Sequence, residues 1–257
     1  MTAPQTDAPS INGMDLFLRG RTVTLTDAER AALARSISEV RRVPARTTLV
    51  DRGERLHHST MLVDGLMTRY IDDLEGGRQV VAFHVAGDFV DLHGYPLQTL
   101  DHSIMGLTDV TIGLVPHDAI DRLIEQDAQL GRKLWFSTLL DAAIHREWLF
   151  RLGRLDAIGR VAHFMVETEA RLAAVGLSDG RSFVLPITQT DLAEIVGLTP
   201  IHVNRVLRTL REEHICTFRS SRVDIADHPR LARLGQFDPT YLYLQAAGSD
   251  MIDTREP

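Results

Sequence analysis

The stretch TQTDLAEIVGLTPIHVNRVLRTLRE, from Thr188 to Glu212, constrains the fold more tightly than any other part of the chain. Thr188 stands just before an apolar-periodic run, where its hydroxyl can cap the first amides of a helix. Gly197 ends that run and can adopt the left-handed conformation that closes a helix. Thr199 offers a second cap, and Pro200 suits the first helical position because that residue needs no amide hydrogen. The segment therefore predicts two helices joined by a three-residue turn.

The second of these helices has one apolar and one polar face. Its apolar stripe consists of Val203, Val206, Leu207 and Leu210. The opposite face carries Asn204 and Arg205 near the start of the helix. Arginine can bond bidentately to guanine O6 and N7, and asparagine can do the same with adenine. The segment therefore predicts a recognition helix that enters the major groove of DNA.

The following residues, HICTFRSSRVDIAD, predict a short β-hairpin, or wing. Its tip is Arg219–Arg222, whose two arginines are suited to phosphate contacts. A single exposed arginine is more often a solvated surface residue than a base reader. Here, however, the caps, the glycine turn, the polar face and the basic hairpin occur together in the order of a winged helix-turn-helix. The predicted DNA contacts are Thr188, Gln189, Thr199, Pro200, Ile201, His202, Asn204, Arg205, Arg208, Arg219, Ser221 and Arg222.

Charge is distributed unevenly along the chain. The 257 residues carry a formal net charge of -7, yet residues 181–233 contain eight arginines and only six acidic residues, as a local DNA-binding domain requires. The single cysteine, Cys216, excludes an internal disulfide and an iron–sulfur cluster held by several thiolates of one chain. No apolar run reaches the roughly 20 residues of a membrane helix, and no signal peptide is recognisable. We therefore expect a soluble, cytoplasmic protein that does not contact a membrane.

Residues 44–116 show short runs rich in Val, Ile and Thr, broken by glycine-bearing turns. This pattern predicts an antiparallel β-roll of the double-stranded β-helix or jelly-roll type. Within it, Gly76-Gly77 are expected to supply the positive-φ positions of a tight hairpin. Ahead of the roll, Thr26 and Glu29 form a capping-box pattern that predicts a helix over 27–40. The predicted fold class is α+β.

The chain from Asp118 to Leu155 contains no proline and predicts one long helix, or a short helix followed by a long one. An alternating three- and four-residue spacing places a seam on the long helix at Trp135, Thr138, Ala142, His145, Leu149 and Leu152. Such a seam fits a dimer interface between two helices, although a helix that packs on its own domain gives a similar pattern. A further helix is expected to begin at Asp156.

In GGRQVVAFHVAGDFVDL, in the long helix and above all in TQTDLAEIVGLTPIHVNRVLRTLREEHI, the sequence resembles the CRP/FNR family of bacterial transcription regulators. The resemblance implies a homodimer joined through the long helix and a sensory, cyclic-nucleotide-binding-like β-roll. It also implies a winged helix that binds palindromic operators in double-stranded DNA and contacts RNA polymerase. Arg205 matches the guanine-reading arginine of the family, and Asn204 and Ile201 match two further base-facing positions. Many relatives have glutamate in place of Ile201, so the preferred half-site should differ from theirs.

The resemblance and the sequence patterns together divide the chain into five parts. These are a flexible N-terminal tail (1–20), the sensory β-roll (21–125), the long dimerisation helix (126–155), the winged helix-turn-helix domain (156–235) and a C-terminal extension (236–257). In the extension, Tyr241, Leu242 and Leu244 are expected to pack on the rest of the chain.

The sensory pocket departs from the family pattern. Relatives that bind cyclic AMP supply a glutamate for the ribose and an Arg-Ser pair for the phosphate, and the matching positions here are Leu92 and His102-Ser103. Charge-assisted hydrogen bonds contribute about 1.5–3 kcal/mol each, so their loss disfavours cyclic AMP. We expect a different, unidentified small-molecule effector or none. The residues predicted around the effector pocket are Phe83, Gly87, Asp88, Leu92, His102 and Ser103.

Two alternatives stay open at this point. Eleven histidines, including His57, His58, His84, His93 and His102 in the roll, allow a haem-based gas sensor on the same scaffold. His57 and His58 would point to opposite faces of a strand, however, and no metal site is predicted. A cupin-like metal enzyme fused to a DNA-binding tail would need His-x-His and a following glutamate, which neither HHST nor HVAGDFVDLH provides. We expect a regulator with no catalytic residues.

Overall fold

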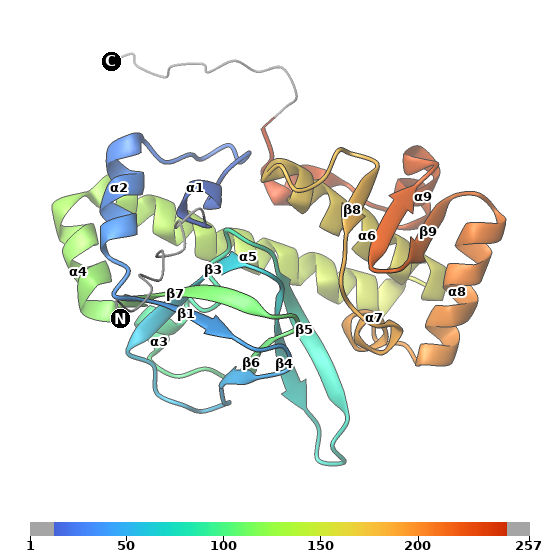
Figure 1. The fold of residues 1–257 in the computed structure, drawn as a ribbon, viewed down its shortest axis with the longest axis horizontal. Coiled ribbons are helices and arrows are strands. Elements are labelled where there is room, and N and C mark those ends of the chain that lie inside the picture. The colour runs from blue at the N-terminus through green and yellow to red at the C-terminus, as the bar shows by residue number, and fades with distance from the viewer. Residues whose placement is uncertain (1–12, 246–257) are drawn as a thin grey trace, which may run out of the picture.

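The computed structural model describes residues 13–245. They form an N-terminal β-roll and a C-terminal winged-helix domain, with the long helix α5 (Ala128–Arg154) running across both (Figure 1). This arrangement confirms the predicted α+β fold class. Among the described residues, no helix is long and apolar enough to cross a membrane.

The β-roll consists of two antiparallel sheets with the strand orders β1-β7-β3 and β2-β6-β4-β5. Side chains from both sheets fill its interior, and Leu62, Met67, Ile104 and Ile112 are completely buried there. The strands are β1 (Glu39–Val43), β2 (Thr48–Val50), β3 (His58–Asp64), β4 (Met67–Asp72), β5 (Arg78–His84), β6 (Ser103–Gly106) and β7 (Val110–Pro116), and the short helix α3 (Gly94–Leu97) precedes β6.

The β4–β5 hairpin forms as predicted, but its two glycines have different roles. Gly76 has a φ of +83°, which favours glycine. Gly77 does not have a positive φ, so the prediction for this residue is wrong. A Cβ on Gly77 would lie 2.6 Å from Asp73 Oδ2, because the Asp73 carboxylate folds back to accept hydrogen bonds from the turn. A side chain at position 77 would therefore push the Asp73 carboxylate out of these hydrogen bonds.

The helix predicted over residues 27–40 is shorter in the structure. Helix α2 (Asp27–Arg35) begins with the expected capping box, in which Glu29 N donates to Thr26 Oγ1 at 3.2 Å and Thr26 N donates to Glu29 Oε2 at 2.6 Å. It ends at Arg35, well before residue 40, because Glu39–Val43 pairs with β7. Backbone groups that hydrogen-bond to a neighbouring strand cannot also continue a helix.

Residues 13–20 also differ from the predicted flexible tail. They include helix α1 (Gly13–Leu16). The side chains of Met14, Phe17 and Leu18 are buried, and the Phe17 ring packs edge-on against Phe89 with 5.3 Å between centroids. The apolar surface that these residues bury holds the segment on the roll. Residues 1–12 lie outside the described range.

Two helices precede the winged-helix domain, as one of the two sequence alternatives predicted. Helix α4 (His117–Gln126) is separated from α5 by Asp127, whose carboxylate accepts hydrogen bonds from the first amides of α5. Helix α6 (Ala157–Ala174) then begins after Asp156, whose Oδ1 accepts from Gly159 N at 2.8 Å. The predicted cap at Asp156 is confirmed.

The C-terminal domain combines helices α7 (Gln189–Val196), α8 (Pro200–Glu212) and α9 (His228–Leu234) with a sheet of order β8-β10-β9. Its strands are β8 (Ser182–Val184), β9 (Cys216–Arg219) and β10 (Arg222–Ile225). One hydrophobic cluster joins this domain to the roll, since Phe83 of β5 packs on Phe164 of α6 with 5.2 Å between ring centroids. The winged-helix domain is thus docked on the roll as well as on α5.

The C-terminal extension returns to the middle of the molecule. Its 3-10 helix η1 (Pro239–Leu242) buries Leu242 completely, and Tyr243 packs edge-on against Phe136 of α5 with 5.6 Å between ring centroids. The predicted packing of the extension on the rest of the chain is therefore observed up to residue 245. Residues 246–257 lie outside the described range.

Candidate DNA-binding surface and effector region

The helix-turn-helix is built from the capping residues that the sequence predicts. Asp191 N donates to Thr188 Oγ1 at 3.2 Å and Thr188 N donates to Asp191 Oδ2 at 2.7 Å, so α7 begins with a complete capping box. Gly197 has a φ of +62° at the end of α7. His202 N then donates to Thr199 Oγ1 at 3.3 Å, with Pro200 as the first residue of α8. These local bonds set where each helix begins, and Gly197 sets where the first one ends.

Helix α8 presents the predicted residues to solvent. Val203 and Leu210 are 0% and 1% exposed, whereas Ile201 is 74% exposed. The remaining residues of the predicted outer face are also exposed: His202, Asn204, Arg205 and Arg208. An isoleucine this open to water on a polar face is suited to an apolar contact, such as one with a thymine methyl group.

The polar groups of this face differ in how firmly they are held. Asn204 Nδ2 donates to Gln189 Oε1 at 3.1 Å, so α7 orients the amide that faces outward. Among the described residues, the guanidinium groups of Arg205 and Arg208 have neither a hydrogen bond nor an ion pair, and both are free to reach a ligand.

The wing forms as predicted, and its two arginines have unequal surroundings. Ser220 and Ser221 have φ values of +48° and +59° in the two-residue turn between β9 and β10. Arg222 Nε donates to Asp224 Oδ1 at 2.9 Å and its guanidinium also donates to Ser182, so part of its charge is neutralised. Arg219 has no such partner among the described residues. A groove of ≈ 290 Å³ separates Arg219 from α8.

Contacts between the roll and α7 were not anticipated from the sequence. The guanidinium of Arg46, in the roll, donates to both carboxylate oxygens of Asp191, one of them at 2.6 Å. Gln79 Nε2, on β5, donates to the Glu194 carbonyl oxygen at 3.1 Å. Burial alone would raise the pKa of Asp191, but hydrogen bonds from Arg46 and Thr188 hold it below its usual value. Asp191, which belongs to the capping box of α7, therefore also ties the helix-turn-helix to the roll.

The seam predicted on α5 lies at the surface of the single chain. Trp135 is 66% exposed and Leu149 is 73% exposed, and the other four predicted residues are partly exposed: Thr138, Ala142, His145 and Leu152. Leu139, which the spacing did not include, is 52% exposed beside them. This apolar strip is not covered by the described residues of its own chain.

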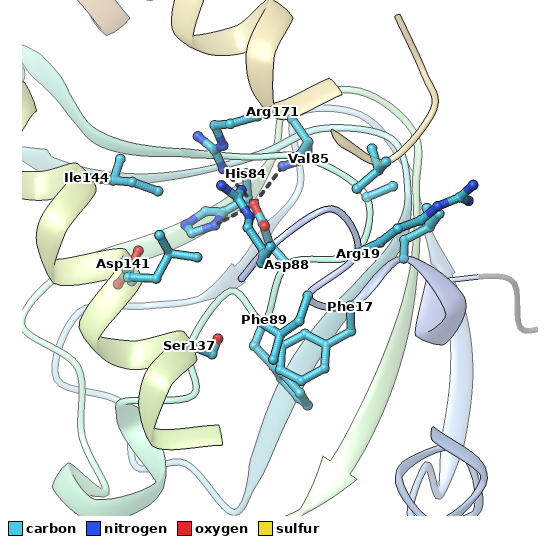
Figure 2. A pocket seen from close by; sticks show the side chains of 17 residues that line it. Phe17, Arg19, His84, Val85, Asp88, Phe89, Ser137, Asp141, Ile144 and Arg171 are labelled. Carbon is cyan, nitrogen blue, oxygen red and sulfur yellow. Dashed lines mark hydrogen bonds and ion pairs between the residues drawn. The ribbon is translucent and has the colours of Figure 1, made fainter. Parts of the chain in front are cut away.

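The six predicted effector residues do not surround one cavity. Gly87 and Asp88 line the pocket shown in Figure 2. Phe83 instead packs on α6, as described above. Leu92 is buried in the hydrophobic cluster beneath α4 and α5. The His102 ring is hydrogen-bonded to the Asp101 carboxylate, and the Ser103 hydroxyl accepts a hydrogen bond from the Arg52 amide. Whether any of them contacts an effector remains a prediction.

A buried arginine occupies the space between the roll and α5. Arg69 on β4 is 2% exposed, and its guanidinium donates to the Val90 carbonyl oxygen at 2.6 Å and to Asp141 Oδ2 at 2.7 Å. Burial would raise the pKa of Asp141, but the charges of Arg69, His84 and His145, together with the hydrogen bond from Arg69, hold it well below its usual value. The only sequence signal for this pair is an arginine in the otherwise apolar centre of MTRYID.

The histidines of the roll do not form a metal centre. No group of three or more His, Cys, Asp or Glu side chains within residues 13–245 could hold a metal ion. His84 is 3% exposed and burial lowers its pKa to about 4. The pocket beside it measures ≈ 40 Å³, whereas pockets for cofactor-sized ligands begin at roughly 300 Å³. A haem therefore does not fit beside His84 in this conformation.

Comparisons with known proteins agree with this architecture. The Crp-like helix-turn-helix domain family matches residues 159–234, and the cyclic nucleotide-binding domain family matches residues 40–127. The transcriptional activator protein FnrL of Cereibacter sphaeroides is 28% identical over 224 residues, which cover 84% of this chain and 89% of FnrL. The fumarate and nitrate reduction regulatory protein of Vibrio cholerae is 23% identical over 211 residues, which cover 82% of this chain and 84% of that protein.

Solved structures show the same fold. FixK2 from Bradyrhizobium japonicum superposes with a TM-score of 0.67 at 23% identity, over 76% of this chain and 96% of FixK2. A CRP-family transcriptional regulator from Thermus thermophilus superposes with a TM-score of 0.62 at 17% identity, over 80% of this chain and 100% of that one.

Proposed function

The chain belongs to the CRP/FNR family of transcription regulators, and from this premise we propose that it binds palindromic operators in double-stranded DNA as a homodimer. The observation that carries the proposal is the outer face of α8. There Ile201, Asn204 and Arg205 are exposed near a capped helix start, while Val203 and Leu210 anchor the opposite face in the core. This is the geometry that direct readout in the major groove requires.

Two copies are needed because one short helix contacts too few bases to specify a single site in a genome. The 27 residues of α5 span roughly 40 Å, and exposed apolar side chains such as Trp135 and Leu149 are spaced along them. We assign this strip to the helix of a second copy. A two-fold axis along α5 then places the two recognition helices in successive major grooves, about 34 Å apart, which makes the operator a palindrome.

Arg205 and Asn204 are assigned to base edges, with the alkyl group of Ile201 beside them. Arg219 is assigned to a DNA phosphate, and Arg222 contributes less because Asp224 already pairs with it. The angle between the two α5 helices of the dimer determines whether the two recognition helices fit successive major grooves. This angle is set by a bound effector, or by the protein itself if it has none. RNA polymerase is the expected partner at the promoter, since the related FnrL is a transcriptional activator protein.

The proposal is tested by selecting bound fragments from a pool of random duplexes with the full chain, with and without cell extract. The expected product is a two-fold symmetric sequence with half-site centres about 10 base pairs apart, bound by two chains. An enriched sequence without symmetry, or binding by a single chain, would contradict the homodimer. Failure to enrich any sequence under either condition would contradict sequence-specific binding.

A further inference from the structure

The pocket in Figure 2 lies where four parts of the chain meet. Its walls come from the N-terminal segment at Phe17, the turn at Gly87, α5 at Ser137 and the end of α6 at Arg171. The roll, the long helix and the DNA-binding domain therefore all contribute to it. Its volume of ≈ 40 Å³ leaves room for about three water molecules, or for one ligand of three or four heavy atoms.

Two almost completely buried guanidinium groups line this pocket. Arg171 is 3% exposed and donates to the Phe83 carbonyl oxygen at 2.8 Å and to Asp88 Oδ2 at 2.6 Å. Its Nε is buried and has no hydrogen-bond partner among the described residues. Arg21 is 6% exposed and donates to the Leu242 carbonyl oxygen at 2.5 Å. Because a buried N–H without an acceptor is costly, an acceptor bound in this pocket would be stabilised.

The charges around the pocket also favour an anion. Three arginines but only two carboxylates line the pocket: Arg19, Arg21, Arg171, Asp88 and Asp141. Asp88 is paired with Arg171, Asp141 is paired with Arg69, and the buried Glu167 lies 3.6 Å from the other side of the Arg171 guanidinium. Burial, together with repulsion from the charge of Arg171, lowers the pKa of Arg21 to about 10. Both guanidinium groups still carry their charge at neutral pH. A negative charge between them would relieve this repulsion in a medium of low dielectric constant.

We propose that this pocket binds one small planar monoanion, either a carboxylate such as formate or a nitrogen oxoanion such as nitrate or nitrite, between Arg21 and Arg171. Guanidinium groups match planar oxoanions because their N–H groups form paired, charge-assisted hydrogen bonds. The walls at Phe17, Phe89 and Ile144 are apolar and disfavour a strongly hydrated, doubly charged anion. The volume excludes nucleotides and phosphate esters.

Such an anion would connect the DNA-binding domain to the rest of the chain. Arg171 belongs to α6, whereas Arg21 belongs to the N-terminal segment and holds the C-terminal extension through Leu242. Bridging the two fixes α6 more firmly on the roll and on α5. The regulatory consequence rests on the proposed function, because it requires the winged helix to bind DNA, whereas anion binding itself does not.

The test is calorimetric titration of the purified full chain, in buffer free of chloride, with formate, nitrate, nitrite and sulfate in turn. We expect saturable one-to-one binding of at least one planar monoanion and at least tenfold weaker binding of sulfate. Arg21→Gln should weaken binding of the monoanion at least tenfold, because it removes one of the two guanidinium groups. Ser137→Leu should do the same by filling the pocket while leaving both arginines in place, so it decides the question even if Arg21→Gln does not fold.

Arg122→Gln is the matched control, since it removes one positive charge from an exposed site on α4, where Arg122 is 59% exposed. It should bind the monoanion as the wild type does. The absence of saturable binding for all three monoanions, sulfate binding as tight as theirs, or unchanged affinity in Ser137→Leu would overturn the site. DNA binding by the same preparation without added anion is measured separately, so a failed anion site is distinguishable from a failed DNA-binding assignment.

Discussion

Tyr241→Phe removes a single hydroxyl from the C-terminal extension, and we expect it to lower the free energy of unfolding by about 1.5–3 kcal/mol. The Tyr241 hydroxyl donates to Glu167 Oε2 at 2.7 Å, and Glu167 is 1% exposed. The carboxylate oxygen that loses this bond cannot turn to water instead. The expected loss is therefore that of a hydrogen bond to a buried charged group.

Glu167 cannot avoid this loss by taking up a proton. Burial would raise the pKa of Glu167, but the His163 ring 3.6 Å away and the charges of Arg171 and Arg151 lower it to about 2. The carboxylate stays ionised near neutral pH and keeps one further neutral donor, Trp148 Nε1, at 3.0 Å. Removing the tyrosine donor thus leaves a buried charge with fewer partners.

The assay is urea unfolding followed by tryptophan fluorescence, because Trp148 contacts the perturbed carboxylate directly. Tyr243→Phe is the matched control, since Tyr243 lies in the same segment, is 46% exposed and keeps its ring contact with Phe136 as phenylalanine. It should change stability very little. A loss below about 0.5 kcal/mol for Tyr241→Phe, the usual range of surface substitutions, would refute the reasoning, as would an equal loss in both variants.

Three further predictions follow from other buried or exposed groups. Burial raises the pKa of Asp91 to about 6, so the folded chain binds this proton more tightly than the unfolded chain and loses stability as the pH rises from about 4 to 6. Asp91→Asn should remove this pH-dependent loss of about 3 kcal/mol, and a pH series of urea midpoints that keeps the wild-type slope would contradict this. Arg46→Ala should accelerate amide exchange in α7 and lower the free energy of unfolding by only about 1 kcal/mol, because Arg46 is 44% exposed. Unchanged exchange would show that the contact between Arg46 and Asp191 does not stabilise α7. Leu149→Glu should yield monomers in sedimentation velocity with unchanged secondary structure, whereas a persistent dimer would place the interface elsewhere.

The sequence predicted those features that depend on neighbouring residues. Thr188, Gly197 and Thr199 define the helix-turn-helix because caps and left-handed glycines act within a few residues of the chain. The exposed face of α8 followed from helical periodicity alone. The end of α2 was misplaced because the strand that replaces its last turn is stabilised by β7, a partner about seventy residues further along the chain.

The polar contacts between domains could not be predicted in this way. Arg69 meets Asp141 across 72 positions and Arg46 meets Asp191 across 145, and no local pattern marks either pair. Phe83 was assigned to an effector pocket because the sequence does not show that its ring packs on another domain. Pairings of this kind are set by how the roll, α5 and the winged helix dock, which only the three-dimensional structure shows.

The central claim is that the outer face of α8 reads DNA sequence, and the most direct test compares Arg205→Ala with Arg219→Ala on a selected operator and on random duplex. Arg205→Ala should reduce the free energy of binding to the operator by about 1–3 kcal/mol, while binding to random DNA changes little. Arg219→Ala should weaken both by a similar factor and reduce the salt dependence, as expected for a phosphate contact. Equal losses on both duplexes for Arg205→Ala would contradict the claim.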